Sequence, residues 1–379
     1  MKDKKIGARK REASGESLGR LRAEIRDITK SIFNLAKARQ NLSERVALIK
    51  ESKSLTVENR QIESKLIDAM QEYSANIGLD ARLARHVTKD LVESSKSMQR
   101  RAIHFSKIKK HLSFHGVKQV GIVGAGRMGG WFASYFKPLV GRVVLFDSDR
   151  KFGKERAREL GCDYSGSLTG VADSDLILVA VPMSEMIEVA DLLLKQTKKK
   201  RTQTRILEIS SIKERVIKGV GKRGPDLHHI HPLFGSSADY FADNCMIVVE
   251  SRGRKEDAFV KGLFPHFKIL NLNARDHDKL MTFELSLPHI LALTFADIVS
   301  EMKGRSDISS PSYDSLLQLA RKTLSENPKV YYEIQSQNMH NQEMLRKIKK
   351  SVAELEELVS SGDYERFAKF FSKTKKRLD

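Results

Sequence analysis

The stretch Val120-Gly-Ile-Val-Gly-Ala-Gly-Arg-Met-Gly-Gly130 decides the fold. It begins as a short apolar run typical of a buried strand, and Gly124, Gly126 and Gly129 follow in G-x-G-x-x-G spacing before a helical segment. In such a turn the first glycine allows the bend, the second lets a pyrophosphate approach the backbone, and the third permits close packing of helix on strand. The free N–H groups of the helix N-terminus then face the phosphates. The stretch therefore predicts a dinucleotide site.

The next apolar run, Arg142-Val-Val-Leu-Phe-Asp147, ends in an acidic residue about 20 residues after the glycines, as a ribose contact requires. Asp147 can accept hydrogen bonds from both ribose hydroxyls and repels a 2′-phosphate, so it favours NAD over NADP, although Arg150 lies close by. The loop Ala180-Val-Pro182 follows a third strand, where cofactor-facing loops lie in such folds. The predicted cofactor-binding residues are Gly124, Gly126, Arg127, Met128, Gly129, Asp147, Val181 and Pro182.

On either side of this stretch the sequence pattern changes twice. Short β-rich runs alternate with helical segments from Gly116 to about residue 272, which predicts a mainly parallel sheet of Rossmann type. After about Asn273 only helical patterns remain, and residues 17–101 read as three helices, the first carrying an apolar stripe. The predicted fold is α/β with all-α flanking domains: a disordered basic tail at 1–16, a helical module at 17–105, the Rossmann domain at 116–272 and a helical C-terminal dimerisation domain at 273–379.

Composition narrows the class of protein. The 379 residues carry a net charge of +20, which indicates nucleic acid, anionic small molecules or a generally basic surface as partners. Two distant cysteines argue against a disulfide scaffold and a cysteine zinc site. No apolar run approaches the roughly 18 residues of a membrane span, and the N-terminus lacks a secretory segment, so we expect a cytoplasmic protein without membrane attachment.

Three polar clusters follow the cofactor segment: Glu208-Ile-Ser-Ser-Ile-Lys213, Leu227-His-His-Ile-His-Pro-Leu-Phe-Gly235 and Glu284-Leu-Ser-Leu-Pro-His289. The histidine cluster invites a zinc interpretation, but no cysteine or acidic ligand pattern accompanies it, so we expect no metal site. A histidine that titrates near neutral pH is suited to removing an alcohol proton during hydride transfer.

These clusters, behind a GxGxMG turn, resemble the prephenate dehydrogenase family over about residues 117–375. The resemblance implies that His231 contacts the ring hydroxyl of prephenate, that Ser211 lies beside the cofactor, and that His289 is a second active-site histidine. It implies hydride transfer to NAD with loss of carbon dioxide, giving 4-hydroxyphenylpyruvate. The family's substrate-binding arginine falls at Lys322, with Arg321 beside it, and we favour Arg321 slightly. Preference for prephenate or for its amino analogue arogenate stays open, as does feedback by tyrosine.

The N-terminal helices resemble the all-helical chorismate mutase domain over about residues 17–101. The positions that match the family are Arg22, Arg39, Lys50, Glu63, Ser95 and Gln99. The family's second-helix arginine and its preceding acidic residue are Ile62 and Asn59 here. Because 17 residues separate Arg22 from Arg39 on one helix, the resemblance implies a homodimer in which Arg22 is lent to the partner's site.

Three alternatives remain. The helices could be a dimerisation arm without catalysis, and the α/β part could be an NADP-dependent reductase or a β-hydroxyacid dehydrogenase of another pathway. The basic helices could also bind nucleic acid, but they lack interleaved aromatic residues, so we expect no nucleic-acid partner. We expect small dianions, chorismate and prephenate, as substrates.

Overall fold

The structure is a computed structural model that describes residues 17–198, 204–221, 227–242, 244–250, 253–301 and 309–378. The chain divides into two compact units, residues 1–110 and 111–379. The predicted basic tail at residues 1–16 lies outside the described residues. The predicted domain boundaries stay predictions.

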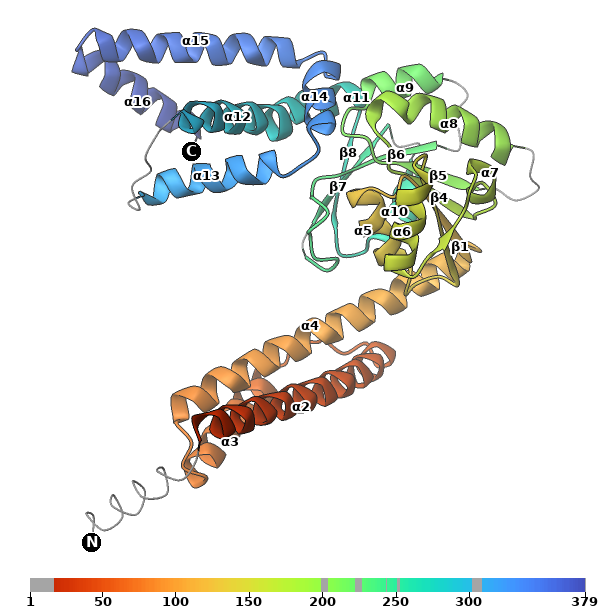
Figure 1. The fold of residues 1–379 in the computed structure, drawn as a ribbon, viewed down its shortest axis with the longest axis vertical. Helices are drawn as coiled ribbons and strands as arrows, with labels where there is room; N and C mark the ends of the chain where they lie inside the picture. Colours follow the sequence, from red (N-terminus) through yellow and green to blue (C-terminus); the bar gives the residue numbers. More distant parts are fainter. Residues whose placement is uncertain are drawn as a thin grey trace. The chain divides into compact units, whose positions relative to one another are not determined.

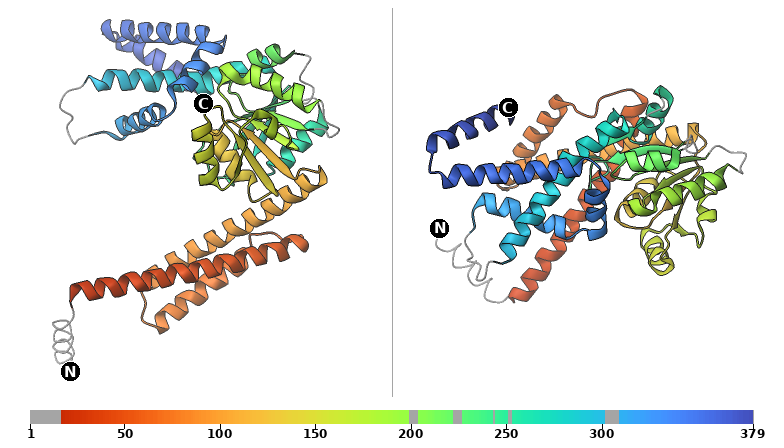
Figure 2. Two further views of the ribbon diagram at one scale, coloured as in Figure 1. Left: turned by 45° about the vertical axis from the view of Figure 1, so that its right-hand side comes forward. Right: turned by 90° about the horizontal axis from the view of Figure 1, so that it is seen from above.

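The first unit consists of α2 (Leu18–Ser52), α3 (Arg60–Asn76) and most of α4 (Ala81–Phe114) (Figure 2). Polar side chains start these helices: Ser17 accepts a hydrogen bond from the backbone N–H of Arg20, and Asn59 accepts one from that of Ile62. The expected end of the third helix near residue 101 is wrong. Helix α4 continues to Phe114 because no breaker interrupts it before Gly116, which has a φ of +69°.

The second unit contains one eight-stranded sheet in the order β3-β2-β1-β4-β5-β6-β7-β8. All neighbouring strands pair in parallel except β6 and β7. The strands are β1 (Gln119–Val123), β2 (Arg142–Phe146), β3 (Asp163–Tyr164), β4 (Leu176–Val179), β5 (Arg205–Glu208), β6 (Leu227–Pro232), β7 (Cys245–Val249) and β8 (Lys268–Leu272). The strand order reverses between β1 and β4, the place where open α/β sheets bind ligands. The predicted Rossmann-type sheet is confirmed.

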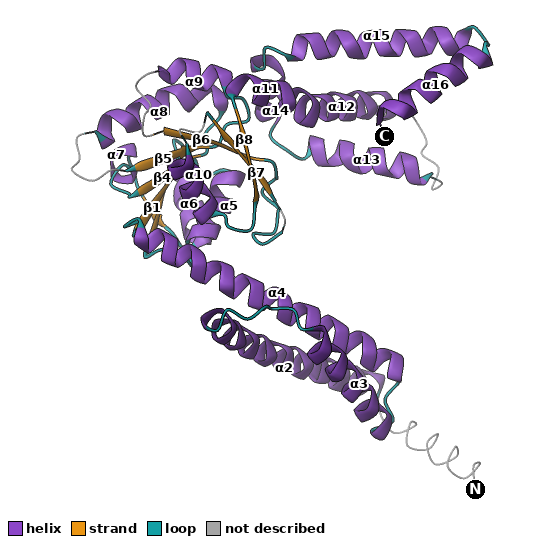
Figure 3. Ribbon diagram, turned by 180° about the vertical axis from the view of Figure 1, so that it is seen from behind, coloured by secondary structure: helices purple, strands orange, loops and turns teal. Residues whose placement is uncertain are grey.

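Helices cover both faces of this sheet (Figures 1 and 3). On one face, α7 (Leu168–Val171), α8 (Met183–Thr197) and α9 (Glu214–Val220) pack on β1, β2, β4, β5 and β6 through a core of branched aliphatic side chains. The apolar core of the other side includes Phe132 and Phe136 of α5 (Arg127–Phe136) and Phe264, directly after α10 (Arg254–Leu263). Helix α6 (Arg150–Leu160) contacts β2 and α5. Burial on both faces explains why the strands read as continuous apolar runs.

Strand β6 is the one long strand that the sequence pattern did not predict. Its three histidines interrupt the apolar run, and the period of two explains how they are accommodated. Leu227 and His229 face the α9 side, where Leu227 joins the core and His229 meets Glu208. His228 faces α10, where its Nδ1 lies 2.7 Å from Glu256 Oε1.

The C-terminal helices are α11 (Ala274–Met281), the π-helical turn η2 (Thr282–Ser286), α12 (Leu287–Ser300), α13 (Pro311–Leu324), α14 (Pro328–Gln337), α15 (Asn341–Ser360) and α16 (Tyr364–Leu378). The sequence pattern over residues 330–360 predicts a single helix, and this prediction is wrong, because the structure divides the segment into α14 and α15. The backbone of Asn338 is extended, and its buried side-chain amide donates to the carbonyl of Asp278 at 2.7 Å. That buried hydrogen bond ends α14 and starts a new helix.

One helical run among the described residues, Ala274–Ser300, is long and apolar enough to cross a membrane by length and composition. Only 22 % of its apolar window is buried within the chain. The run is not continuous α-helix, because η2 lies within it. An apolar surface of this kind also suits contact with another protein surface.

Candidate functional site

At two of the three glycines of the turn, neighbouring backbone atoms leave no room for a side chain. A side chain on Gly124, which has a φ of +94°, would place its Cβ 2.4 Å from the Ala180 carbonyl oxygen. A Cβ on Gly129 would lie 1.8 Å from the Gly124 carbonyl oxygen. A Cβ on Gly126, in contrast, would meet no protein atom within 4 Å. Gly126 therefore borders open space at the start of α5, as a cofactor approach requires.

Asp147 stands at the end of β2 beside this turn. Its Oδ2 accepts from the backbone N–H of Ala125 at 2.8 Å, and its Oδ1 accepts from that of Asp149 at 2.9 Å. Each carboxylate oxygen keeps acceptor capacity for a further hydroxyl. The orientation of the carboxylate is thus set by backbone groups before any ligand arrives. The residues around the turn fit a dinucleotide whose ribose carries free hydroxyls.

The loop after β4 completes this side of the site. Val181 and Pro182 are half-buried, and Pro182 precedes α8. Glu333 of α14 closes the start of that helix: its carboxylate accepts from Met183 N at 2.8 Å and from Ser184 Oγ at 2.6 Å. A buried carboxylate of the C-terminal helices therefore fixes the loop next to the predicted cofactor.

A cavity of about 370 Å³ opens beside the glycine turn and joins the separate sequence motifs. Arg127 and Met128 line it from the turn, and Ser211, His231 and His289 line it from the three polar clusters. Glu284, the first residue of the third cluster, also lines it, as do Glu326 and Tyr331, which were not predicted. The cavity thus brings together the predicted residues that bear hydroxyl, imidazole and ammonium groups.

His231 lies at the buried wall of the cavity, 3 % exposed. Its Nδ1 is 3.0 Å from Nε2 of His277, whose Nδ1 is 2.7 Å from Oδ1 of Asp278. Burial holds the pKa of His231 well below its usual range, and His277 and Lys213 add to this effect. We expected a histidine that titrates near neutral pH. Desolvation instead keeps the ring neutral, so that it can accept a proton.

His289 lies in the first turn of α12 against the ring of Tyr331, with 4.2 Å between the ring centroids. Burial lowers the pKa of His289 to about 4, so the ring is neutral at physiological pH. Its Nδ1 is buried without a hydrogen-bond partner among the described residues. A buried nitrogen of this kind is suited to a polar group of a ligand.

Glu208 and Lys213, which flank Ser211 in the sequence, form a buried ion pair. Lys213 Nζ contacts Glu208 Oε1 at 2.5 Å and donates to the carbonyl of Ile230 at 2.8 Å. Glu208 also accepts from the backbone N–H and the hydroxyl of Ser210. Burial alone would raise the pKa of Glu208, but Lys213 and His229 outweigh it and hold this pKa low. The pair connects the Ser210-Ser211 loop to strand β6, which carries His231.

The two candidate cations for a substrate carboxylate lie differently. Both side chains are exposed, but Lys322 lines the cavity and Arg321 is not among the lining residues. Arg127 is held toward the same helical region, because it donates to Glu326 Oε2 at 2.8 Å. Sequence analysis missed Glu326 and Tyr331, which only the packing of α13 and α14 brings to the cavity. The signal available in the sequence was that both follow Arg321 and Lys322 within ten residues.

In the first unit, Arg39 donates to the carbonyl of Leu91 and to the hydroxyl of Ser95, both on α4. Ser95 and Gln99 are buried, and Gln99 Oε1 has no hydrogen-bond partner among the described residues. Lys50 donates to the carbonyl of Val57 at 2.7 Å. The structure therefore brings Arg39 and Ser95 together across two helices, with a buried amide one turn further along α4.

Arg22 is exposed near the start of α2. At 1.5 Å per residue, 17 residues place it about 25 Å from Arg39 along the helix. The departures from the mutase pattern are accommodated structurally: Asn59 caps α3, and Ile62 is 64 % exposed. Glu63 accepts from the backbone N–H of Asn59 at 3.0 Å and pairs with Lys96 at 3.1 Å.

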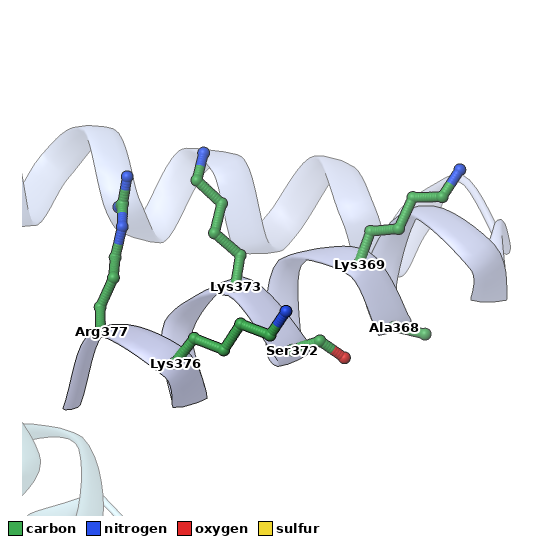
Figure 4. Close-up of a pocket in the computed structure, with 6 residues that line it drawn as sticks. All are labelled: Ala368, Lys369, Ser372, Lys373, Lys376 and Arg377. Carbon is green, nitrogen blue, oxygen red and sulfur yellow. The ribbon is translucent and has the colours of Figure 1, made fainter. Parts of the chain in front are cut away.

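A larger hollow, about 560 Å³, lies over α16, and Figure 4 shows its lining side chains projecting from a single helix. Four of the six lining residues are basic: Lys369, Lys373, Lys376 and Arg377. They are exposed, and no acid, imidazole or glycine turn joins them in this lining. We therefore place the chemistry in the smaller cavity beside the glycine turn.

A doubly wound sheet with this glycine turn, Asp147 and a cavity lined by two neutral histidines defines a dinucleotide-dependent oxidoreductase. Three families match the chain. They are described as the nucleotide-binding domain of prephenate dehydrogenase, at residues 134–259; the dimerisation domain of prephenate dehydrogenase, at residues 273–373; and chorismate mutase type II, at residues 21–100. The chain therefore belongs to the prephenate dehydrogenase family and carries a chorismate mutase domain at its N-terminus. It combines an oxidoreductase with an isomerase.

Individual relatives agree with this assignment. The chain is 22 % identical to the T-protein of Enterobacter agglomerans over 93 % of its own length and 91 % of that protein. It is 25 % identical to a protein named "Probable arogenate/prephenate dehydrogenase" of Methanocaldococcus jannaschii, over 68 % of this chain and 60 % of that one. Among solved structures, prephenate dehydrogenase from A. aeolicus, in complex with hydroxyphenyl propionate and NAD+, has a TM-score of 0.58 at 20 % identity. The match covers 69 % of this chain and 97 % of that one and shares the fold.

Proposed function

We propose that the chain catalyses two consecutive reactions of tyrosine biosynthesis. The first unit rearranges chorismate to prephenate, and the second oxidises and decarboxylates prephenate to 4-hydroxyphenylpyruvate with NAD. The observation that carries the dehydrogenase proposal is the convergence of Ser211, His231, His289 and Lys322 with the glycine turn on one cavity. The family matches support both parts.

NAD fits the glycine turn, because the space over Gly126 is open and Asp147 presents preset acceptors. When bound, NAD supplies the acceptor for the hydride that leaves C4 of the ring. The proposed binding residues are those of the turn (Gly124, Gly126, Arg127, Met128 and Gly129), together with Asp147, Val181 and Pro182. The negative charge of Asp147 disfavours the 2′-phosphate of NADP.

His231 acts as the base in this proposal. Its neutral ring accepts the proton of the C4 hydroxyl, and the electron pair of the O–H bond forms the carbon–oxygen double bond as hydride leaves. The ring carboxylate then departs as carbon dioxide, and its bonding electrons aromatise the ring. The phenolate oxygen takes the proton back from His231. Ser211 and His289 serve to orient the substrate by hydrogen bonds, with the buried Nδ1 of His289 as the available group.

Lys322 is the proposed partner of a substrate carboxylate, since it lines the cavity and Arg321 does not. An ammonium acts as a point charge, without the bidentate geometry of a guanidinium. We therefore expect K322A to raise KM while kcat changes less. R321A provides the matched control, because it removes a neighbouring cation of the same helix that lies outside the cavity lining.

For the mutase reaction, Arg39 and Lys50 are the proposed contacts of this chain to a dianion, with Ser95, Gln99 and Glu63 beside them. Chorismate mutase needs a compact substrate conformer and stabilisation of the ether oxygen, so cations and an amide suffice. Arg22 completes the site from a partner subunit in this proposal. The apolar stripe of α2 supports such pairing: Ile25, Ile28, Ile32 and Leu35 are each at least 59 % exposed.

We infer a homodimer on these grounds, and the match to a dimerisation domain supports it. The exposed apolar side chains of α12 and α13, such as Ile298 and Leu324, are surfaces that a partner subunit would cover. A cytoplasmic location agrees with this biosynthetic role.

One assay tests the proposal. Purified protein receives chorismate or prephenate, with and without NAD, and loss of chorismate and formation of NADH are followed separately. We expect both signals. NADH from prephenate without chorismate loss would leave the helices as a dimerisation arm. No oxidation of prephenate or arogenate with NAD or NADP would refute the dehydrogenase proposal and reopen a reductase of another pathway.

A further inference from the structure

A chain of three polar side chains leads from the cavity into the protein. His231 lines the cavity, and its Nδ1 lies 3.0 Å from Nε2 of His277. His277 Nδ1 lies 2.7 Å from Oδ1 of Asp278. His277 and Asp278 are at most 1 % exposed, and neither lines the cavity. They therefore contact no substrate and can act on it only through His231.

The hydrogen bonds between His231, His277 and Asp278 determine which nitrogen of each imidazole ring carries a hydrogen. Asp278 is an acceptor when ionised, so His277 Nδ1 carries a hydrogen and donates it. In the neutral ring His277 Nε2 is then an acceptor, and His231 Nδ1 must donate to it. His231 Nε2 consequently holds a lone pair. It is the ring nitrogen left to take a proton from a molecule in the cavity.

Asp278 is itself held rigidly. Its Oδ1 accepts from the backbone N–H of Lys213 at 2.8 Å, and its Oδ2 accepts from that of Glu214 at 2.9 Å. Its main-chain carbonyl accepts from Asn338 Nδ2 at 2.7 Å and from Thr282 Oγ1 at 3.1 Å. The first two hydrogen bonds fix the carboxylate and the other two hold its main chain, so that Asp278 presents a fixed acceptor to His277.

We propose that His277 and Asp278 are positioning residues of the dehydrogenase reaction: they hold His231 in the tautomer that accepts the hydroxyl proton and stabilise its protonated form. The inference rests on the proposed function. As the substrate O–H bond breaks, an N–H bond forms at His231 Nε2 and a positive charge appears on the ring. The carboxylate of Asp278 compensates that charge through His277, and the proton returns to the phenolate oxygen later.

Two other charged groups, Lys213 and Glu208, also affect the protonation of His231 and His277. Lys213, between β5 and α9, disfavours protonation of both His231 and His277. Glu208 of β5 favours protonation of both rings, and Asp278 favours that of His277. Because Lys213 and Glu208 form an ion pair with each other, Asp278 is the carboxylate whose removal changes the balance most directly.

The test compares Asp278→Asn and His277→Gln with Thr282→Val as a matched control. T282V removes a hydrogen bond to the Asp278 carbonyl but leaves the carboxylate and both rings. We expect D278N to lower kcat about 10²-fold or more, the range of a general base that loses its function. The KM for prephenate and the Kd for NAD should stay within threefold, and the acid limb of kcat/KM should move to lower pH. H277Q keeps an acceptor for His231 Nδ1 and should lose less activity than His277→Leu.

The tautomer is read directly by ¹⁵N NMR of histidine-labelled protein, with the His231 signals assigned through H231N. In the wild type we expect Nδ1 of His231 to be protonated and Nε2 to be bare, and in D278N a mixture of tautomers. This readout does not depend on turnover, so it tests the tautomer of His231 separately from the dehydrogenase activity and distinguishes a failure of this inference from a failure of the proposed function. D278N or H277Q with kcat within threefold of wild type, an unmoved acid limb and an unchanged His231 tautomer would overturn it. Should D278N fail to fold, H277Q and H277L decide.

Discussion

The three glycines of the cofactor turn can be separated by experiment. A Cβ on Gly129 would lie 1.8 Å from the Gly124 carbonyl oxygen, whereas a Cβ on Gly126 would meet no protein atom within 4 Å. The backbone of Gly126 has a φ of −61°, which alanine adopts without strain. Gly129→Ala should therefore damage the fold, and Gly126→Ala should damage only cofactor binding.

The magnitudes follow from these contacts. The clash at Gly129 is roughly 1.5 Å or more short of van der Waals contact and involves backbone, so we expect the upper end of overpacking, about 3 kcal/mol. For a unit of this size that corresponds to a Tm lower by about 6–12 °C. At Gly126 the added methyl leaves stability within about 1 kcal/mol. Loss of one or two charge-assisted hydrogen bonds between pyrophosphate and backbone should raise the Kd for NAD about 10- to 100-fold.

Calorimetry of both variants without cofactor, followed by titration with NAD, measures the two effects independently. Chorismate mutase activity serves as the internal control, because neither glycine belongs to the first unit. A G129A variant as stable as the wild type, or a G126A variant that binds NAD normally, would refute the division of roles argued here.

Three further outcomes are expected. Glu208→Gln leaves Lys213 with a neutral partner in a fully buried site and should cost about 3–5 kcal/mol in urea unfolding, whereas a loss below 1 kcal/mol would mean that the pair is dispensable. The pKa of His289 is lowered to about 4 in the folded state, whereas the unfolded chain binds this proton near pH 6.5. The free energy of unfolding should therefore fall as the pH drops from about 6.5 to 4, and the slope should be smaller in His289→Leu. Equal slopes in the two proteins would contradict this prediction. Glu333→Gln should weaken NAD binding severalfold with little change in prephenate KM at saturating NAD, because Met183 and Ser184 lose a charged acceptor beside the cofactor loop; unchanged NAD affinity would exclude that role.

The sequence predicted the parts of this molecule whose signal is local. The glycine turn, Asp147 and the apolar strands β1, β2, β4, β5, β7 and β8 are predicted from spacing and periodicity. Strand β6 was not predicted, because two of its inward positions are histidines, whose polar nitrogens are paired with Glu208 and His277. These partners are 21 and 46 residues away in the sequence, so a local pattern cannot predict the pairing.

The same limit applies to the site. His231 and Ser211 belong to short motifs and could be named in advance, but Tyr331 and Glu326 acquire meaning only when α13 and α14 pack against the cavity. The choice between Arg321 and Lys322 depends on one residue of helical phase, about 100°, which decides which of the two lines the cavity. Asn338 shows the same principle for the fold, since a buried hydrogen bond to Asp278 interrupts an otherwise continuous helical pattern.

Part of the net charge of +20 is explained by the two proposed active sites, which place cations near their substrates in different ways. Both must gather cations around a small dianion. The dehydrogenase cavity does so within the chain, because the carboxyl ends of β1, β5 and β6 meet at one edge of the sheet and the C-terminal helices add Lys322. Arg127 spans the two parts, since it extends the cofactor turn and is paired with Glu326. The first unit has no sheet edge on which to converge. Its long helix places Arg22 about 25 Å from Arg39, which is why we propose that Arg22 reaches the mutase site of a second copy.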